Sequence, residues 1–252
     1  MTSPLLDHDR VGGIGWLERT GGSLTDEERR RLRRHILLGQ LAGVTGRLAV
    51  LLGRRPDSTE APTPPDSAMA RAAEVAAADQ PPTLVEHSYR TWLFGRALAS
   101  FDGVSDLDDE LFYVASLLHD AGLVSAVTGE DFTLRSVAAA AEVAAPHCGH
   151  GDVLVLRDAV AAHSTPGVSI ETDGAVAFFV QAGATCDLGG LRLQHLAKSF
   201  VADTLERHPR RGLVDDIRGR IDVEADAVPD GRFALLRRTG FGLAIRLAPL
   251  PG

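Results

Sequence analysis

The feature that most constrains the fold is a succession of Ala- and Leu-rich segments with helical periodicity between Ala68 and about Asp203. Apolar residues recur there at the three- and four-residue spacing of one helix face, and few stretches alternate as a half-buried strand does. Clusters of Gly, Pro and Asp separate the segments by short connections. The expected helices cover residues 68–78, 83–100, 107–120, 133–145, 152–163, 174–187 and 191–206. The pattern predicts an all-α helical bundle.

The sequence on either side of this region is organised differently. The stretch SLTDEERRRLRRHILLGQLAGVTGRLAVLL begins with a cap-like Thr25 followed by two acidic residues, which predicts one long helix or two short ones. Residues 53–67 are rich in Pro, Ser and Thr and predict a linker or exposed loop. We therefore expect an N-terminal extension and linker over 1–66, irregular up to residue 23, and a main helical domain over 67–252. The final residues, 231–252, predict a short irregular strap or a small hairpin.

Composition limits the environment and the partners. A chain of 252 residues with 44% hydrophobic content is long enough to bury one sizeable core. The net charge of −8 gives no overall footprint for nucleic acid. No apolar run approaches the roughly 18 residues of a membrane span, and Cys148 and Cys186 form no CxxC pair. We expect a cytoplasmic protein with reduced thiols and without a nucleic-acid or membrane partner, and we leave open a homo-oligomer.

The stretch LLHDAGL, residues 117–123, places two polar residues at the apolar end of a predicted helix. Asp120 is expected at the helix C-terminus, before a left-handed turn at Gly122, where a carboxylate is unfavourable by about 0.3–1 kcal/mol even when it is exposed. Burial among leucines costs more unless a partner is present. A protonated His119 or a metal ion bound to both side chains would satisfy the pair.

The same arrangement recurs at a second helix end. Asp187 closes the apolar segment DGAVAFFVQAGATCDLGG just before two glycines, and His87 lies near the apolar face of TLVEHSYRTWLFGRAL. A lone buried histidine is usually a satisfied core residue. Two histidines and two carboxylates from three helices of one bundle instead predict a metal site, because such sites are built from inward-facing side chains. The candidate ligands are His87, His119, Asp120 and Asp187, a set that suits zinc or iron better than magnesium.

The order of these four residues, with the motifs HSYRTWLFG, ASLLHDAGL, AVAAHSTPG and QAGATCDLGG, resembles the HD-domain superfamily over approximately residues 69–210. The motifs look closest to the cyanamide-hydratase-like branch. The resemblance implies a helical hydrolase or hydratase in which the four residues hold one divalent metal. Water activated by the metal attacks phosphorus or a nitrile carbon of a small polar substrate, and Asp120 or a carboxylate behind the ligands accepts the proton.

Three further residues are candidates for contact with the substrate. His163 ends an apolar helix, where its cation would complement the helix dipole, but it could also face the cavity as a catalytic or substrate-binding donor. Arg90 and Arg135 could bind a substrate anion, and an ordinary structural role explains them equally well. Arg135 follows Thr133, which is the expected helix cap.

Two alternatives stay open at this stage. If His147 or His150 turned inward beside His163, the ligands would suffice for two metals, as in the di-iron oxygenases that the resemblance also includes. In the other alternative the chain is a non-catalytic regulatory or binding module, whose basic run RRRLRRH binds a partner.

Overall fold

The computed structural model describes residues 7–251, which form an all-α bundle with no β-strand in that range. The all-α prediction is therefore confirmed. The helices are α1 (Ile14–Thr20), α2 (Asp26–Leu51), α3 (Ala68–Ala78), α4 (Pro82–Phe101), α5 (Asp109–Leu118), α6 (Phe132–Ala144), α7 (His150–Ala162), α8 (Ile170–Gly189), α9 (Lys198–Arg207), α10 (Leu213–Ala227), α11 (Arg232–Arg238) and α12 (Phe241–Arg246). Two short 3₁₀ turns, η1 (Ala121–Val124) and η2 (Leu193–His195), complete the described elements.

Helices α3 to α8 match the first six expected segments within a few residues at each end. The seventh expected segment, 191–206, is helical only from Lys198, where α9 begins, and both ends of the chain also differ from expectation. The hairpin or strap expected at the C-terminus is wrong, because α11 and α12 are helical. They are too short for a clear periodic pattern, and burial of Leu235 and Ile245 stabilises them. Irregular structure was expected up to residue 23, but Ile14–Thr20 form helix α1, because Trp16 and Leu17 pack into the core. Helix α10 was not predicted.

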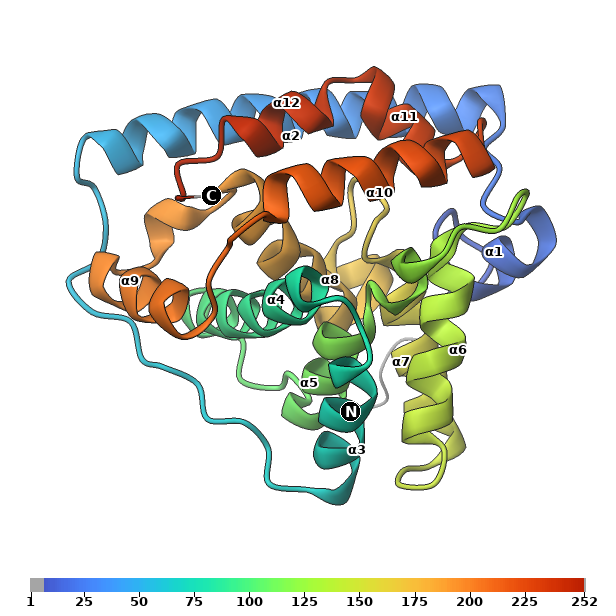
Figure 1. The fold of residues 1–252 in the computed structure, drawn as a ribbon, viewed down its shortest axis with the longest axis horizontal. Coiled ribbons are helices and arrows are strands. Elements are labelled where there is room, and N and C mark those ends of the chain that lie inside the picture. The colour runs from blue at the N-terminus through green and yellow to red at the C-terminus, as the bar shows by residue number, and fades with distance from the viewer. Residues whose placement is uncertain (1–6, 252) are drawn as a thin grey trace.

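Helix α2 is a single helix of 26 residues. Thr25 accepts a hydrogen bond from the Glu28 amide, and the Glu28 side chain accepts one from the Thr25 amide. This capping box satisfies two amides that the first turn leaves free. In Figure 1, α2 spans the top of the molecule behind α11 and α12, with α10 below them. After α2, residues 54–66 run without regular structure to α3 on the opposite side.

Helices α4 and α8 cross at the centre of the bundle (Figure 1). Their backbones approach closely at two glycines: a Cβ atom on Gly95 would overlap the Phe179 carbonyl, and one on Gly183 would overlap the Thr91 carbonyl. This close crossing brings His87 of α4 next to Asp187 of α8. Among the described residues, no helix is both long enough and apolar enough to cross a membrane.

Candidate metal centre

Three helices deliver three buried histidines and one aspartate to the same point. His87 lies within α4, His119 caps the C-terminus of α5 and is followed by Asp120, and His163 caps the C-terminus of α7. The chain turns sharply after Asp120, but Gly122 does not adopt the expected left-handed conformation. Glycine is needed there because a Cβ atom would overlap the Phe132 carbonyl.

The Asp120 carboxylate lies at the centre of this group. Its Oδ2 atom is 3.2 Å from His119 Nε2 and 3.5 Å from His87 Nε2, and its Oδ1 atom is 3.4 Å from His163 Nε2. The three residues His87, His119 and Asp120 each offer one ligand atom within 4.8 Å of the other two. These three of the four candidate ligands thus converge.

Each histidine is oriented by an acceptor on its other ring nitrogen. His119 Nδ1 donates to the Ser116 carbonyl at 2.8 Å, and His163 Nδ1 donates to the Val160 carbonyl at 2.6 Å. A carbonyl can only accept, so Nδ1 carries a proton in both rings, and in the neutral form of either ring Nε2 is the atom left with a lone pair. The Nε2 atoms of His87 and His119 are buried and have no hydrogen-bond partner within the described residues. Ligand histidines in metal sites are held in this manner.

Burial and the neighbouring charges set the protonation of the group. Burial lowers the pKa of His87 and of His163 and keeps both rings neutral. Burial alone would also lower the pKa of His119, but the adjacent Asp120 carboxylate raises it. Burial alone would raise the pKa of Asp120, yet His119 and His163 hold it well below its usual range. Asp120 is therefore an anion, as a metal-binding carboxylate must be.

Asp187, the fourth expected ligand, contacts the opposite edge of the His87 ring. Its Oδ2 atom accepts from His87 Nδ1 at 2.6 Å, whereas Asp120 faces Nε2. Arg90 binds both Asp187 oxygens at 2.8 and 3.0 Å, and Arg210 Nε lies 3.0 Å from Oδ1. Burial alone would raise the pKa of Asp187, but Arg90 and His87 lower it strongly. In this structure Asp187 orients His87 and is not one of the three convergent ligands.

Both arginines that were expected to bind substrate pair with protein groups. Arg90 has no exposed surface, and besides Asp187 it donates to the carbonyls of His208 and Pro209. Arg135 donates to the Gly122 carbonyl and to Glu224, which ties the turn after Asp120 to α10. Both guanidinium groups are therefore paired with protein acceptors in this structure, and their role in substrate binding stays a prediction.

The positions of His147 and His150 do not support the alternative of a second metal. Both side chains are exposed around the turn between α6 and α7, whereas His163 is buried at the other end of α7. A helix of 13 residues spans about 20 Å, so these histidines cannot share a metal with His163.

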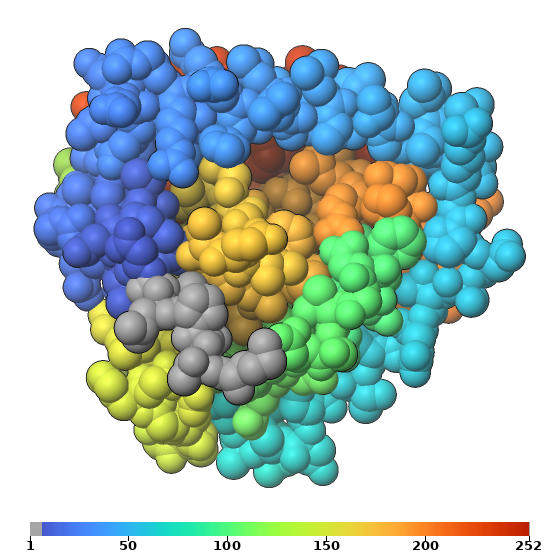
Figure 2. Space-filling model, turned by 180° about the vertical axis from the view of Figure 1, so that it is seen from behind, coloured from blue at the N-terminus to red at the C-terminus, as the bar shows by residue number. Residues whose placement is uncertain are grey.

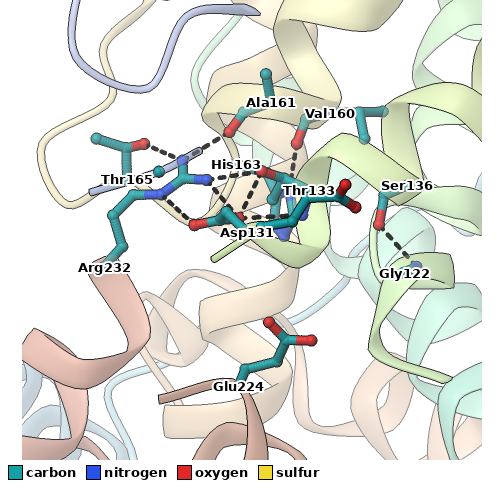
Figure 3. A network of polar contacts seen from close by, with 12 residues as sticks. Gly122, Asp131, Thr133, Ser136, Val160, Ala161, His163, Thr165, Glu224 and Arg232 are labelled. Carbon is teal, nitrogen blue, oxygen red and sulfur yellow. Dashed lines mark hydrogen bonds and ion pairs between the residues drawn. The ribbon is translucent and has the colours of Figure 1, made fainter. Parts of the chain in front are cut away.

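Sequence reasoning missed a buried network that supports His163. Asp131, and not the expected Thr133, caps α6, and it forms an ion pair with Arg232 of α11 at 2.8 Å. Arg232 Nη1 also donates to the Ala161 carbonyl and to Thr165, on either side of His163 (Figure 3). An acid placed two residues before Thr133 was the available signal for the cap; nothing in the sequence marks Arg232 as its partner.

A cavity of about 410 Å³ leads from the histidine cluster to the surface. His87, His119, Asp120 and His163 line its inner end, and α2, α8, α10, α11 and α12 form its walls. Most of the wall side chains are apolar, including Ile36, Leu188, Ile221, Phe233 and Leu236. Helices from both ends of the chain, α2 and α11–α12, thus help to shape the approach to the cluster.

Comparison with known proteins agrees with this geometry. No curated protein matches the chain. The HD domain family matches residues 84–227, more than half of the chain, and this span contains His87, His119, Asp120, His163 and Asp187. The chain belongs to the HD domain family.

Proposed function

We propose that this protein is a metal-dependent hydrolase or hydratase whose metal is held by His87, His119 and Asp120. One observation carries the proposal: two buried Nε2 atoms without hydrogen-bond partners face a buried carboxylate, and each ring is fixed through its Nδ1 atom. Leaving such polar atoms unsatisfied costs about 1–3 kcal/mol each, which a bound cation would recover. Membership of the HD family, whose domains bind divalent metals, supports the same assignment.

The donor set suits zinc or iron. Two neutral imidazoles and one carboxylate are ligands that these ions accept, whereas magnesium prefers oxygen donors. Such an ion supplies Lewis acidity, which lowers the pKa of bound water from about 15.7 to about 7 and makes it a nucleophile at neutral pH.

Asp120 and His163 are placed to orient the reacting groups and to move protons. Asp120 lies between His119 and His163, with one carboxylate oxygen toward each ring. His163 has an unprotonated Nε2 atom because its Nδ1 proton is bound to Val160. His163 is therefore placed to accept a proton from an incoming water or to donate one to a leaving group, with Asp120 stabilising its charged form.

The cavity supports a substrate larger than the small polar molecule expected from the sequence. A small polar molecule would leave most of the 410 Å³ unfilled and would face apolar walls. We propose a substrate that carries its reactive polar group, a nitrile or a phosphate ester, at one end of an apolar body. The polar end reaches the histidines and the apolar body lies against the side chains of α8, α10 and α11.

The first test is the metal content per chain of protein purified without added metal or chelator, measured by elemental mass spectrometry. One zinc or iron per chain is expected in the native protein and in the control His147→Ala, whose histidine is exposed and distant. His119→Ala and Asp120→Ala should lose the metal together with turnover of nitriles or phosphate esters bearing alkyl chains. Full metal occupancy in both variants would refute the proposal.

The same measurement distinguishes the alternatives. Two irons per chain with oxygen-dependent turnover would support the di-iron oxygenase, although the exposed positions of His147 and His150 argue against it. A folded protein that takes up no metal after reconstitution would support the non-catalytic binding module.

A further inference from the structure

Helix α2 presents an apolar stripe to solvent that no described part of the chain covers. Seven side chains on this helix and its end are between 52% and 80% exposed: Leu37, Leu38, Leu41, Val44, Leu48, Leu51 and Leu52. Leu37, Leu41, Val44, Leu48 and Leu51 follow one another at alternating spacings of four and three residues, which places them on one face. The buried residues of the same helix, such as Leu32 and Ile36, lie on the face toward the body.

Arginines surround this stripe, although the chain as a whole is acidic. Residues 29–56 contain eight arginines and no acidic residue, although Asp26, Glu27 and Glu28 form the first turn of α2. Residues 231–252 contain four arginines and no acidic residue. Seven arginines on these two segments are exposed and form no ion pair with any residue in the range 7–251: Arg30, Arg31, Arg33, Arg34, Arg54, Arg238 and Arg246. Arg30 and Arg34 continue the four- and three-residue spacing of the stripe toward the start of α2. The surface is therefore apolar along its length and cationic at its edges.

The C-terminal helix α12 extends the same surface. Arg47 of α2 donates to the Ala244 carbonyl of α12 at 3.0 Å, so the two helices are in contact. Leu243 of α12 and Leu247, which follows the helix, are more than half exposed, and Arg246 lies between them in the sequence. We call the exposed side chains of α2 and α12 the arginine–leucine face.

The cavity of the histidine cluster opens at this face. Val44, Leu243 and Leu247 are exposed and also line the cavity. Figure 2 shows a hollow beneath α2 through which the C-terminal helices are visible. A molecule bound against the arginine–leucine face would therefore lie at the entrance that leads to His119 and Asp120.

Charge decides between the occupants of such a face. The spacing of the stripe also suits pairing with α2 of a second copy. In a parallel pair, however, the flanking arginines would meet arginines. In an antiparallel pair the arginines after Leu52 would meet Asp26, Glu27 and Glu28, but Arg30, Arg33 and Arg34 would face the opposite end of α2, which has no acid. An anionic lipid surface complements both properties, since its acyl region accepts leucines and its headgroups attract arginines.

We propose that this protein docks on anionic phospholipid bilayers through the arginine–leucine face, with α2 lying in the plane of the interface. The expectation of no membrane partner rested on the search for a spanning segment, and a helix lying on the surface has no such segment. Docking in this orientation presents the mouth of the cavity to the lipid. Binding to vesicles requires neither metal nor turnover, so the outcome is independent of the proposed function.

The test is co-sedimentation of the full chain with vesicles of phosphatidylcholine alone and of phosphatidylcholine with one third phosphatidylglycerol. Binding is expected for the anionic vesicles at low salt, with loss on neutral vesicles and at high salt. Arg30→Gln with Arg33→Gln should reduce the partition coefficient roughly 25-fold, because each arginine near an anionic surface contributes about fivefold. The matched control is Arg211→Gln, an exposed arginine outside both segments.

The apolar part of the face is tested by Leu41→Glu, at a side chain 65% exposed, against Val75→Glu on α3, at one 72% exposed. Both should leave the circular dichroism spectrum unchanged, and Leu41→Glu alone should abolish vesicle binding. The proposal would be overturned by equal vesicle binding of Leu41→Glu and the native chain. It would also be overturned if the native chain did not bind the vesicles but formed a dimer in sedimentation velocity. In that case Leu41→Glu should dissociate the dimer.

Discussion

Asp187 accepts a hydrogen bond from His87 Nδ1 at 2.6 Å, across the crossing of two helices a hundred residues apart in the sequence. The contact fixes the ring so that its other nitrogen faces Asp120. Arg90 and Arg210 in turn hold the Asp187 carboxylate by ion pairs in a fully buried setting. The orientation of one metal-facing histidine thus depends on a chain of contacts that extends to the segment between α9 and α10.

The first prediction concerns Asp187→Asn. The amide oxygen can still accept from His87, but the two buried arginines lose their counter-charge, so we expect a loss of stability of about 3–5 kcal/mol. Metal affinity should fall by roughly 10- to 100-fold, because the ring is held less firmly. Urea unfolding and metal titration measure the two effects. The control Asp203→Asn, at an exposed site, should change neither, and unchanged metal affinity in the folded Asp187→Asn protein would contradict the orienting role.

The second prediction concerns the crossing of α4 and α8. Gly183→Ala places a methyl group against the Thr91 carbonyl and forces the helices apart, which should cost about 1–3 kcal/mol. Gly219→Ala is the matched control on α10, where a Cβ atom would meet nothing within 4 Å. That exposed helical substitution should stabilise the protein by about 0.5–1 kcal/mol. Thermal unfolding measures the two changes in stability, which should have opposite signs. If Gly183→Ala left the stability unchanged, the crossing would tolerate the extra atom.

The sequence predicted the helices that carry the centre because their burial is periodic. The segments around His87, His119 and Asp187 repeat apolar residues at helical spacing over ten residues or more, and their ends are marked by acids or glycines. The convergence of His87, His119 and Asp120 followed from their positions on inward faces of one bundle. Helices α11 and α12 are shorter than two turns each, so their periodicity carries little information, and tertiary packing decides their structure.

The role of Asp187 could not be predicted because its partners come from distant segments. Arg90 lies one turn from His87, but the sequence does not tell whether it faces a substrate or a neighbouring carboxylate. Arg210 lies in a connection with no periodic pattern, and its ion pair with Asp187 depends on the path between α9 and α10. A spacing pattern identifies a buried carboxylate, whereas its partners are a property of the assembled bundle.

The third prediction concerns pH. Burial alone would raise the pKa of Asp131, but the ion pair with Arg232 and the hydrogen bonds from Thr133 lower it. A depressed native pKa means that the contribution to stability is complete above the unfolded value of about 3.9 and is lost as pH falls through the native value. Asp131→Asn should therefore cost about 3–5 kcal/mol near neutral pH, and this difference should shrink between about pH 5 and pH 2. A constant difference in urea midpoint over that range would exclude the titration of Asp131 as its cause.

The fourth prediction uses His163 to separate metal binding from proton transfer. His163 Nε2 faces Asp120 but lies outside the group of three convergent ligands. His163→Ala should keep one metal per chain and should still gain thermal stability from added zinc, by about 2–4 °C for each kcal/mol of binding free energy. His119→Ala should show no such gain, since it lacks a ligand. Turnover should fall by roughly 10²- to 10⁴-fold in His163→Ala, the usual contribution of a positioned acid or base. If His163→Ala lost the metal as completely as His119→Ala, His163 would have to be counted as a ligand, and the proton-transfer role would pass to another group.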